Sequence, residues 1–436
     1  MDLATLFEQH VRRLQAETEK ALAEAGFDSL VVSSGAPFTY FADDRDAPHE
    51  PTPHFAHWCP LRGPHHLLHV VPGRRPRLVR HAPEDYWYEQ GGVTDPFWVK
   101  AFALEEAGSI EAAWSALGRP ANAAYVGNEV DRAAAGGLAA NPPALTSRLD
   151  WARSYKDPYE LACLEEATAL GARGHRAARE AFAAGGSELE IHQAFVRAVG
   201  CPDAELPYTT IVALDEKGAT LHYESKRPVR DGRVLLLDAG AARRRYACDI
   251  TRTTTAGVGD PRFAELVRRV DELEQDVVRA ATPGRPYLDV HLDAHRGVAR
   301  ILADLRLVRV PAEEALAKGY THPFFPHGIG HHLGIQVHDV AGRQADPSGT
   351  PAPPPKEHSY LRNTRTIEAG HVFTIEPGIY FIPMLLRPFR TGSDAAAFDW
   401  SAIDALTALG GVRIEDNVLV TTGDPEVLTA DIPKQL

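Results

Sequence analysis

The sequence of 436 residues contains only four cysteines, and it has no long apolar run. The cysteines are scattered and none belongs to a C-x-x-C pair, which argues against both a disulfide framework and a zinc ribbon. No stretch approaches the roughly eighteen apolar residues of a membrane span, and the first residues lack the basic and apolar segments of a signal peptide. We therefore expect a protein of a reducing compartment, the cytoplasm, with no membrane partner.

A stripe of basic residues is also missing. The chain carries 46 Lys and Arg against 59 Asp and Glu, a formal net charge of -13, so a nucleic-acid partner is not expected. An acidic balance of this kind is compatible with carboxylates buried around cations. The apolar and charged fractions, 44% and 24%, are those of an ordinary soluble globular protein, and the length favours two domains.

Residues 1–154 predict an α/β domain. Apolar residues recur at helical spacing from about residue 3 to 25 and stop at Gly26. Segments with the pattern of strands follow at 29–33, 66–71, 77–79 and 123–126. Residues 40–60 are rich in Pro, His and Asp and are too long for a simple connection, so they form either a surface loop or an active-site lid.

Residues 155–436 predict a second domain made of two similar halves, α+β with antiparallel sheets. Each half begins with a pair of helices, because Asp157-Pro158 and Asp260-Pro261 both combine an N-cap residue with a proline at the first helical position. Ser187 and Glu190 form a capping box for the second helix of the first pair. Strands are expected after each helix pair, in the first half at 208–214, 221–223 and 234–255, and a long loop over 341–357.

The stretch 234–255 predicts a hairpin that carries two aspartates. If its turn is centred on Arg243-Arg244, then Asp238 and Asp249 lie opposite each other across the ladder. Two facing carboxylates need a proton or a cation between them, and a divalent metal is the simplest answer. The alternative is a slipped register with two exposed strand-end aspartates, since Arg-Arg is unfavourable in a tight turn.

Two further glutamates end or follow strand-like segments. Alternation places Val372, Thr374 and Glu376 on one face of a strand, and Arg413, Glu415 and Asn417 on one face of another. Taken singly, such glutamates are more often solvated strand residues than ligands. Five histidines, among Gly-rich sequence, form either a site or a surface turn: His322, His327, His331, His332 and His338.

Together these residues offer four carboxylates and one imidazole. Hard oxygen donors with a single nitrogen suit manganese, magnesium or cobalt better than a thiolate zinc site would. Four negative charges match two divalent cations with room for a bridging hydroxide. The composition is therefore typical of a two-metal hydrolase site.

Five motifs then occur in one order along the chain: Asp238-Ala-Gly, Asp249-Ile-Thr-Arg-Thr, His327-Gly-Ile-Gly-His-His-Leu-Gly, Thr374-Ile-Glu-Pro-Gly and Val412-Arg-Ile-Glu-Asp. This order resembles the pita-bread metallopeptidases, and within them the bacterial Xaa-Pro dipeptidases, or prolidases, whose relatives include organophosphorus acid anhydrolases. The resemblance spans nearly the whole chain. It implies a catalytic pita-bread domain with pseudo-twofold symmetry behind the N-terminal α/β domain.

The resemblance also implies the site. Two divalent ions are expected, Mn²⁺ first, with Co²⁺ or Zn²⁺ as alternatives. Asp249 and Glu415 would bridge both ions, Asp238 would hold one, and His331 with Glu376 the other. Substrate contacts are implied for His222, His327, His338, Arg365 and Arg413.

The implied reaction is hydrolysis of a dipeptide with proline at its C-terminus. Glu376 would accept the proton of the attacking water, and His338 and His222 would stabilise the developing oxyanion or the proline side. Arg365 would bind the substrate carboxylate, and Arg413 either substrate or Glu415. The alternatives are an aminopeptidase P, an organophosphate-hydrolysing relative and, disfavoured because all five ligands are present, a non-catalytic binding protein.

One segment departs from the prolidase pattern. Where the family resembles Tyr-Pro-Phe-Lys-x-Asn-Pro, residues 47–53 read Ala-Pro-His-Glu-Pro-Thr-Pro, although His54, Phe55 and Trp58 are retained. In the family this loop helps close the pocket, often that of the neighbouring subunit in a homodimer. The side-chain preference and any organophosphate activity therefore depend on a segment that differs here.

Overall fold

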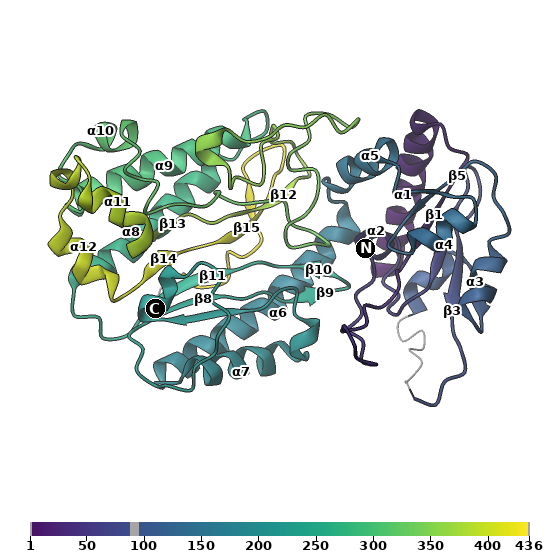
Figure 1. Ribbon diagram of the computed structural model, residues 1–436, viewed down its shortest axis with the longest axis horizontal. Coiled ribbons are helices and arrows are strands. Elements are labelled where there is room, and N and C mark those ends of the chain that lie inside the picture. Colours follow the sequence, from purple (N-terminus) through teal and green to yellow (C-terminus); the bar gives the residue numbers. More distant parts are fainter. Residues whose placement is uncertain (1, 88–95, 435–436) are drawn as a thin grey trace. The chain divides into compact units, whose positions relative to one another are not determined.

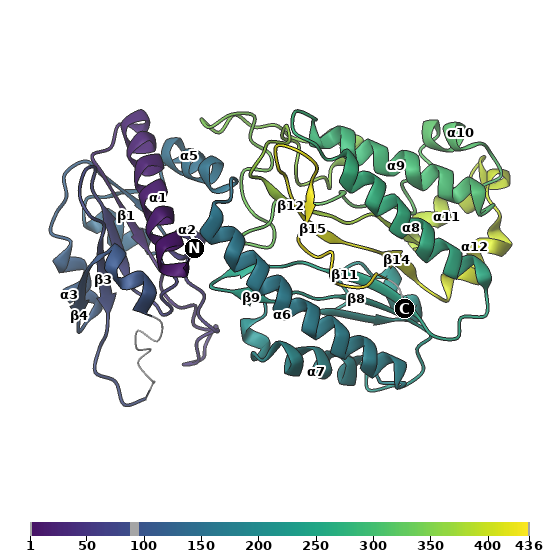
Figure 2. The same cartoon turned by 180° about the vertical axis from the view of Figure 1, so that it is seen from behind.

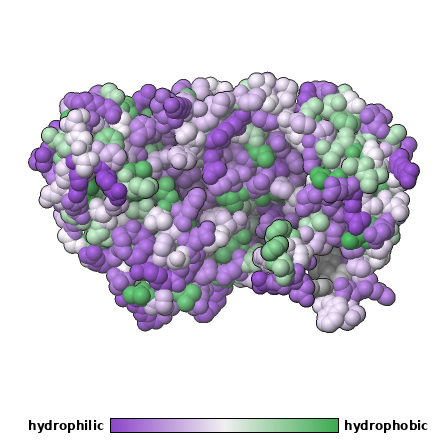
Figure 3. All heavy atoms as spheres, in the orientation of Figure 1, coloured by the Kyte–Doolittle hydropathy of each residue, from purple (hydrophilic) through white to green (hydrophobic). Residues whose placement is uncertain are grey.

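The computed structural model describes residues 2–87 and 96–434, which divide into two compact units. Unit 1 comprises Met1–Ala162 and Ala345–Thr350, and unit 2 comprises Cys163–Gln344 and Pro351–Leu436. No helix among the described residues is both long enough and apolar enough to cross a membrane. In the space-filling view, hydrophilic residues predominate and apolar ones are scattered among them (Figure 3).

Unit 1 is built on one mixed sheet in the strand order β4-β3-β2-β1-β5-β6 (Figure 1). Its strands are β1 (Ser29–Ser33), β2 (Leu67–Val70), β3 (Arg77–His81), β4 (Ala103–Ala107), β5 (Ala123–Val126) and β6 (Ala139–Ala140). Its helices are α1 (Leu3–Ala25), α2 (Pro53–Trp58), η1 (Pro96–Ala101), α3 (Ile110–Ala116), α4 (Val130–Ala135) and α5 (Pro143–Arg153). The expected α/β pattern is confirmed.

Helix α1 shows why this sequence folds locally as predicted. Asp2 caps its first turn by accepting from the backbone N–H of Thr5, and Gly26 ends it in the left-handed conformation. The helix buries the face that carries Phe7, Val11 and Leu14, which are the residues at helical spacing in the sequence.

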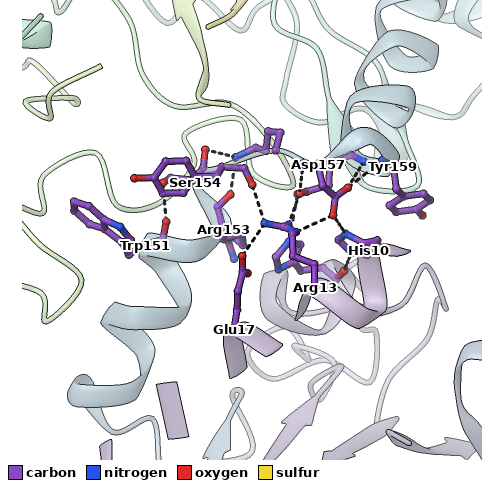
Figure 4. A network of polar contacts seen from close by, with 12 residues as sticks. His10, Arg13, Glu17, Trp151, Arg153, Ser154, Asp157 and Tyr159 are labelled. Carbon is purple, nitrogen blue, oxygen red and sulfur yellow. Dashed lines mark hydrogen bonds and ion pairs between the residues drawn. The ribbon is translucent and has the colours of Figure 1, made fainter. Parts of the chain in front are cut away.

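A network of buried polar residues lies within unit 1, between α1 and the start of α6 (Pro158–Ala183) (Figure 4). Asp157 accepts from the backbone N–H groups of Tyr159 and Glu160, and so caps α6 as predicted. Its carboxylate also lies 2.6 Å from His10 Nδ1 and accepts from Arg13 Nε at 2.9 Å. The second guanidinium arm of Arg13 donates to Glu160 at 2.6 Å.

Unit 2 repeats a helix pair and a sheet (Figures 1 and 2). The first half has α6, α7 (Glu188–Val199) and the sheet β11-β8-β7, whose strands are β7 (Ile211–Leu214), β8 (Val234–Asp238) and β11 (Thr251–Thr255). The second half has α8 (Pro261–Ala280), α9 (Tyr287–Asp304) and the sheets β12-β15-β16 and β13-β14. Those strands are β12 (Val372–Ile375), β13 (Gly378–Tyr380), β14 (Gly411–Arg413), β15 (Asp416–Leu419) and β16 (Glu426–Val427).

The smaller elements of unit 2 are η2 (Asp203–Glu205), η3 (Asp215–Ala219), β9 (Ala242–Arg243), β10 (Tyr246–Ala247), α10 (Ala312–Ala317), η4 (Lys356–His358), α11 (Pro383–Thr391), η5 (Ala395–Ala397) and α12 (Trp400–Thr407). The capping box of Ser187 and Glu190 is present, as predicted. The strand expected over 221–223 was wrong, because Leu221 and His222 form a turn after η3. Leu221 and Tyr223 still pack against the apolar face of the sheet, which explains their apolar pattern without a ladder.

Candidate active site

The hairpin has a different register from the one expected. Thr251 lies opposite Asp238, and Arg243 opposite Tyr246, so the two-residue turn is Arg244-Arg245. Asp249 is thus the diagonal neighbour of Asp238 rather than its direct partner. Because side chains alternate with a period of two, a slip of two residues keeps both aspartates on the same face. The predicted proximity survives, although the predicted register was wrong.

Two close approaches of backbone shape the site. A Cβ on Gly240 would lie 2.1 Å from the carbonyl oxygen of Cys248 across the hairpin. Gly330 has φ +155, and a Cβ there would lie 2.0 Å from the carbonyl oxygen of Thr374. Only glycine permits both contacts. The second contact holds the His331 loop against β12, where Thr374 N donates to His331 O at 2.9 Å.

Both predicted glutamate strands are interrupted at the site. Strand β12 ends at Ile375, so Glu376 lies just beyond it, and Glu415 lies between β14 and β15. Glu415 forms an isolated bridge with Thr251, whose hydroxyl donates to the Glu415 carboxylate at 2.6 Å. The interruptions turn the two glutamates towards β11 and join the two halves of unit 2.

The histidine His331 faces this carboxylate cluster with a defined nitrogen. Its Nδ1 lies 3.0 Å from the carbonyl of His332 and donates to it, so Nε2 carries the lone pair. Nε2 lies 3.5 Å from Asp249 Oδ2 and 3.6 Å from Glu376 Oε1. These distances exceed an ordinary hydrogen bond and are about those between two ligand atoms each roughly 2.1 Å from one ion.

The charges of the cluster are not balanced by protein cations. Burial and repulsion from the neighbouring carboxylates raise the pKa of Glu415 well above its usual range. Burial raises the pKa of Glu376 to about 7, against the attraction of His331. Burial also raises the pKa of Asp238, although Arg413 opposes this. Such carboxylates take up a proton unless a cation neutralises them.

The donor set therefore fits divalent metal. Asp249, His331 and Glu415 each offer a ligand atom, and these atoms all lie within 4.8 Å of one another. Oδ1 of Asp238 is buried with no hydrogen-bond partner among the described residues. Oxygen-rich sites with one imidazole suit hard and borderline divalent ions.

Arg413 is part of the frame of this cluster. It is buried, and its guanidinium donates to Asp238 at 2.7 Å, to the Tyr380 hydroxyl at 2.9 Å and to Thr251 Oγ1 at 3.1 Å. It thus orients Asp238 directly and reaches Glu415 only through Thr251. Asn417 similarly fixes the backbone of Asp249, since Asp249 N donates to Asn417 Oδ1.

The other predicted histidines differ in their settings. The rings of His338 and His331 are 4.4 Å apart between centroids, and His222 is exposed. His327 Nε2 lies 2.8 Å from the hydroxyl of Tyr380, and burial with the nearby Arg413 lowers the pKa of His327 to about 3. Burial and the charges of His331 and Arg362 lower the pKa of His338 to about 3.

The two arginines of the 361–365 segment have contrasting environments. Arg365 is buried, and its Nη2 lies 3.2 Å from Glu368 Oε1. Arg362 is exposed, and its charge acts on His338. Sequence reasoning selected Arg365 and missed Arg362. Only the burial pattern, in which 361, 363 and 365 face inwards, distinguishes them.

Comparison with known proteins supports this interpretation. The profile of metallopeptidase family M24 matches residues 162–422, and that of the N-terminal domain of Xaa-Pro dipeptidases matches residues 5–151. An Xaa-Pro dipeptidase from Pseudoalteromonas atlantica is 40% identical over 99% of both chains. One from Xanthomonas campestris is 42% identical, covering 99% of this chain and 98% of its own.

Solved structures share the fold. Zinc-substituted E. coli aminopeptidase P in complex with product superposes with a TM-score of 0.73 at 22% identity, covering 98% of this chain and 96% of its own. Proline aminopeptidase P II from Yersinia pestis gives the same TM-score at 21% identity and 97% coverage of both chains. The expected fold class, an α/β domain followed by a pita-bread domain, is confirmed. The chain is a divalent-metal-binding member of metallopeptidase family M24 and belongs to its Xaa-Pro dipeptidase branch.

Proposed function

We propose that this chain is an Xaa-Pro dipeptidase that hydrolyses dipeptides with a C-terminal proline. The observation that carries the proposal is the convergence of four buried or half-buried carboxylates and the Nε2 of His331 in unit 2, where the pKa values of Glu376 and Glu415 are raised. Relatives named Xaa-Pro dipeptidase, at about 40% identity over the full length, support the substrate class.

Five residues would hold two divalent ions, with Mn²⁺ as the first choice and Co²⁺ or Zn²⁺ as alternatives. Asp249 and Glu415 would bridge, Asp238 would serve one ion, and His331 with Glu376 the other. When bound, such ions supply an activated water near neutral pH and polarise the scissile carbonyl. Thr251, Arg413 and Asn417 would keep the ligands in place by the hydrogen bonds already described.

Protein groups would carry the proton and stabilise charge. Glu376, which lies beside His331 just beyond β12, would accept the proton of the attacking water and pass it to the leaving nitrogen. His338 and His222 would donate to the oxyanion or to the proline side. His327, whose Nε2 lies 2.8 Å from the Tyr380 hydroxyl, would contact the substrate.

Selection of dipeptides would depend on recognition of the substrate's C-terminal carboxylate. An exposed guanidinium beside His338 can bind that carboxylate through two parallel hydrogen bonds, which makes Arg362 the better candidate. Arg365, the candidate from sequence, would first have to leave its buried contact with Glu368. A carboxylate held close to the metals would exclude longer peptides.

A cleavage panel tests the proposal. Purified protein loaded with Mn²⁺, Co²⁺ or Zn²⁺ is given Xaa-Pro dipeptides and Xaa-Pro-Yaa tripeptides. We expect cleavage of the dipeptides and little of the tripeptides. Preferential cleavage of tripeptides would identify an aminopeptidase P instead, and no hydrolysis with any ion would reject the proposal. A homodimer in the cytoplasm is proposed as its setting, and light scattering checks the oligomeric state.

A further inference from the structure

Four histidines meet in unit 2 outside the carboxylate site. His291 and His295 come from α9, one turn apart, and His322 and His358 come from the segments on either side of the long 341–357 loop. The ring centroid of His291 lies 4.7 Å from that of His295 and 4.6 Å from that of His358. The centroids of His295 and His358 are 5.0 Å apart. His322 lies in a turn and is half-buried, and its ring is 4.9 Å from that of His295.

The ring nitrogens of three of these histidines are close enough together to bind one metal ion. His291, His295 and His358 each offer one ring nitrogen, and the three nitrogens lie within 4.8 Å of one another. The closest pair, His291 Nε2 and His358 Nδ1, is 3.0 Å apart. Two nitrogens bound to one tetrahedral zinc at about 2.1 Å are separated by about 3.4 Å. Small side-chain movements would therefore complete the geometry.

A hydrogen bond to its other ring nitrogen fixes the orientation of His295. Its Nδ1 lies 2.9 Å from the hydroxyl of Thr321, and a proton donated there leaves the Nε2 lone pair for a ligand. A hydrogen bond to the far nitrogen is the usual support of a metal-bound imidazole. Residues four apart on a helix share one face, so α9 presents both of its histidines to the same point.

Packing alone does not account for imidazoles at these positions. His291 and His295 are 1% and 2% exposed on a helix whose other inward residues, such as Val290 and Val298, are apolar. Nδ1 of His291 is buried without a hydrogen-bond partner among the described residues. Leaving a buried polar atom unpaired costs about 1–3 kcal/mol, a cost that an apolar residue would avoid.

The surroundings of the cluster disfavour charge on its rings. Burial, reinforced by the neighbouring histidines, lowers the pKa of His291 to about 2 and that of His295 to about 3. A small cavity adjoins the three histidines and is lined also by His322 and Glu357, which leaves room for a fourth ligand or water.

We propose that His291, His295 and His358 form a third metal site, separate from the carboxylate centre, which takes a borderline divalent cation of the zinc class. All-imidazole donors select such ions over Mn²⁺ or Mg²⁺. The ion would tie α9 to η4, four residues before Arg362, and would thereby fix the segment proposed to receive the substrate carboxylate. The site itself does not depend on the proposed dipeptidase activity.

The test uses the full chain with the carboxylate centre disabled by Asp249→Asn and Glu415→Gln. Zn²⁺ binding is measured by calorimetry, and Co²⁺ binding by the intense visible absorption of a four-coordinate ion. We expect one ion per chain. Adding His358→Gln, a half-buried loop position, should weaken binding about 100-fold or more, beyond the 10–100-fold typical of supporting residues. Adding His192→Gln, a half-buried histidine of α7, should leave the affinity unchanged.

Thermal unfolding shows whether the His358→Gln variant has lost binding because it is misfolded. Without metal, the parent and the His358→Gln variant should melt together, and Zn²⁺ should raise the melting temperature of the parent alone. Absence of a bound ion in the parent, or equal binding by the two proteins, would show that the histidines are only packed together and would overturn the proposal.

Discussion

Two clusters of buried acidic and basic residues, one in each unit, differ in their balance of charge. In the unit 1 network, Asp157 and Glu160 meet Arg13 and His10, and the neighbouring cations keep the pKa of both carboxylates low despite burial (Figure 4). Asp157 itself helps raise the pKa of His10 against burial, so the carboxylates of this network lie beside basic groups that stabilise their charge. In the carboxylate centre, four acidic groups meet only Arg413 and His331, and the pKa values of Glu376 and Glu415 are raised.

The balance of charge distinguishes a structural cluster from a candidate functional site more clearly than the mere presence of buried charge does. A balanced network stabilises the fold and needs nothing from solution. An unbalanced one must take up protons or cations, which makes it a candidate site. The groups His10, His57 and Glu160 also lie close enough to suggest a metal, but Asp157 already contacts His10, and Arg13 already donates to Glu160.

The variant Glu415→Gln tests this difference with the largest expected effect. The variant should lose bound metal and at least about 10³-fold in turnover, because an ion contributes several kcal/mol to such reactions. Without metal it should be no less stable than the parent, since one of four like charges is gone. Metal analysis, kinetics and thermal melts check this. Two retained ions with near-normal turnover would show the ligand assignment to be wrong.

The matching change in unit 1 is Glu160→Gln, and it should have the opposite signature. It removes the buried carboxylate beside Arg13 and His57 and should destabilise the protein by about 3–5 kcal/mol, although Asp157 still accepts from Arg13. Metal content should be unchanged. Denaturant titration provides the measurement, with the partly exposed Glu17→Gln, expected to cost less than about 1 kcal/mol, as control. Equal losses in both variants would mean that the network is not a balanced unit.

A shorter acid should separate the two roles proposed for Glu376. Glu376→Asp keeps the charge but withdraws it by one methylene, and a displacement of about 1 Å can cost on the order of 100-fold in rate. Turnover should therefore fall far more than metal occupancy. If both fell in parallel, Glu376 would act as a ligand only.

Arg362 and Arg365 allow a similar comparison, between an exposed and a buried charge, with smaller expected effects. Arg362→Met should raise KM for a dipeptide about 10–100-fold, because one charge-assisted interaction is lost, and should affect the dipeptide amide much less. Arg365→Met should mainly lower stability, since that side chain is buried beside Glu368. Acid and amide kinetics for both variants distinguish them. A selective acid defect in Arg365→Met would restore the assignment made from sequence.

The smallest effect expected is a pair of opposite pH dependences in the metal-free protein. Glu376 has a folded pKa of about 7 against 4.5, so the folded state holds an extra proton and the stability that Glu376 contributes to unit 2 is lost as pH rises from about 4.5 to 7. The histidines of unit 2 whose pKa values are lowered contribute with the opposite sign. His57 has a pKa of about 4 against 6.5, and that of Glu160 is lowered, so unit 1 should lose stability as pH falls below 6.5.

Each change should be on the order of 1–2 kcal/mol, because coupling spreads the titration over several groups. Hydrogen exchange of peptides from α1 and from α8, corrected for intrinsic rates, measures the two units separately. Divalent metal should remove the Glu376 contribution in unit 2 and leave the slope in unit 1 unchanged. A pH dependence of unit 2 that metal does not alter would contradict the contrast.

Much of this was predictable from local sequence. The helix starts at Asp2, Asp157, Ser187 and Asp260 follow from capping chemistry, which acts over three or four residues. The proximity of Asp238 and Asp249 was predictable because a slip of two residues leaves the face of the strand unchanged. The full set of five candidate ligands was implied by the family resemblance.

The register was not predictable, because its cause is not local. Arg244 and Arg245 adopt φ of 50 and 75, a conformation that Asn-Gly would signal and that arginine does not. Arg243 and Arg244 both pair with Glu166, far away on α6, and this tertiary contact supports the turn. The exposure of Arg362 and the burial of Arg365 were not predictable for the same reason, since burial is decided by the packed structure.

The hydrogen bond between Thr251 and Glu415 spans 164 residues of sequence. Contacts of such separation form slowly, since the chain must first close a long loop. A nascent chain that has exposed only the 234–255 hairpin holds two of the five proposed ligands, and the other three lie in the second half of unit 2. The metal centre therefore cannot guide early folding, and acquisition of metal becomes a report that both halves of unit 2 have come together.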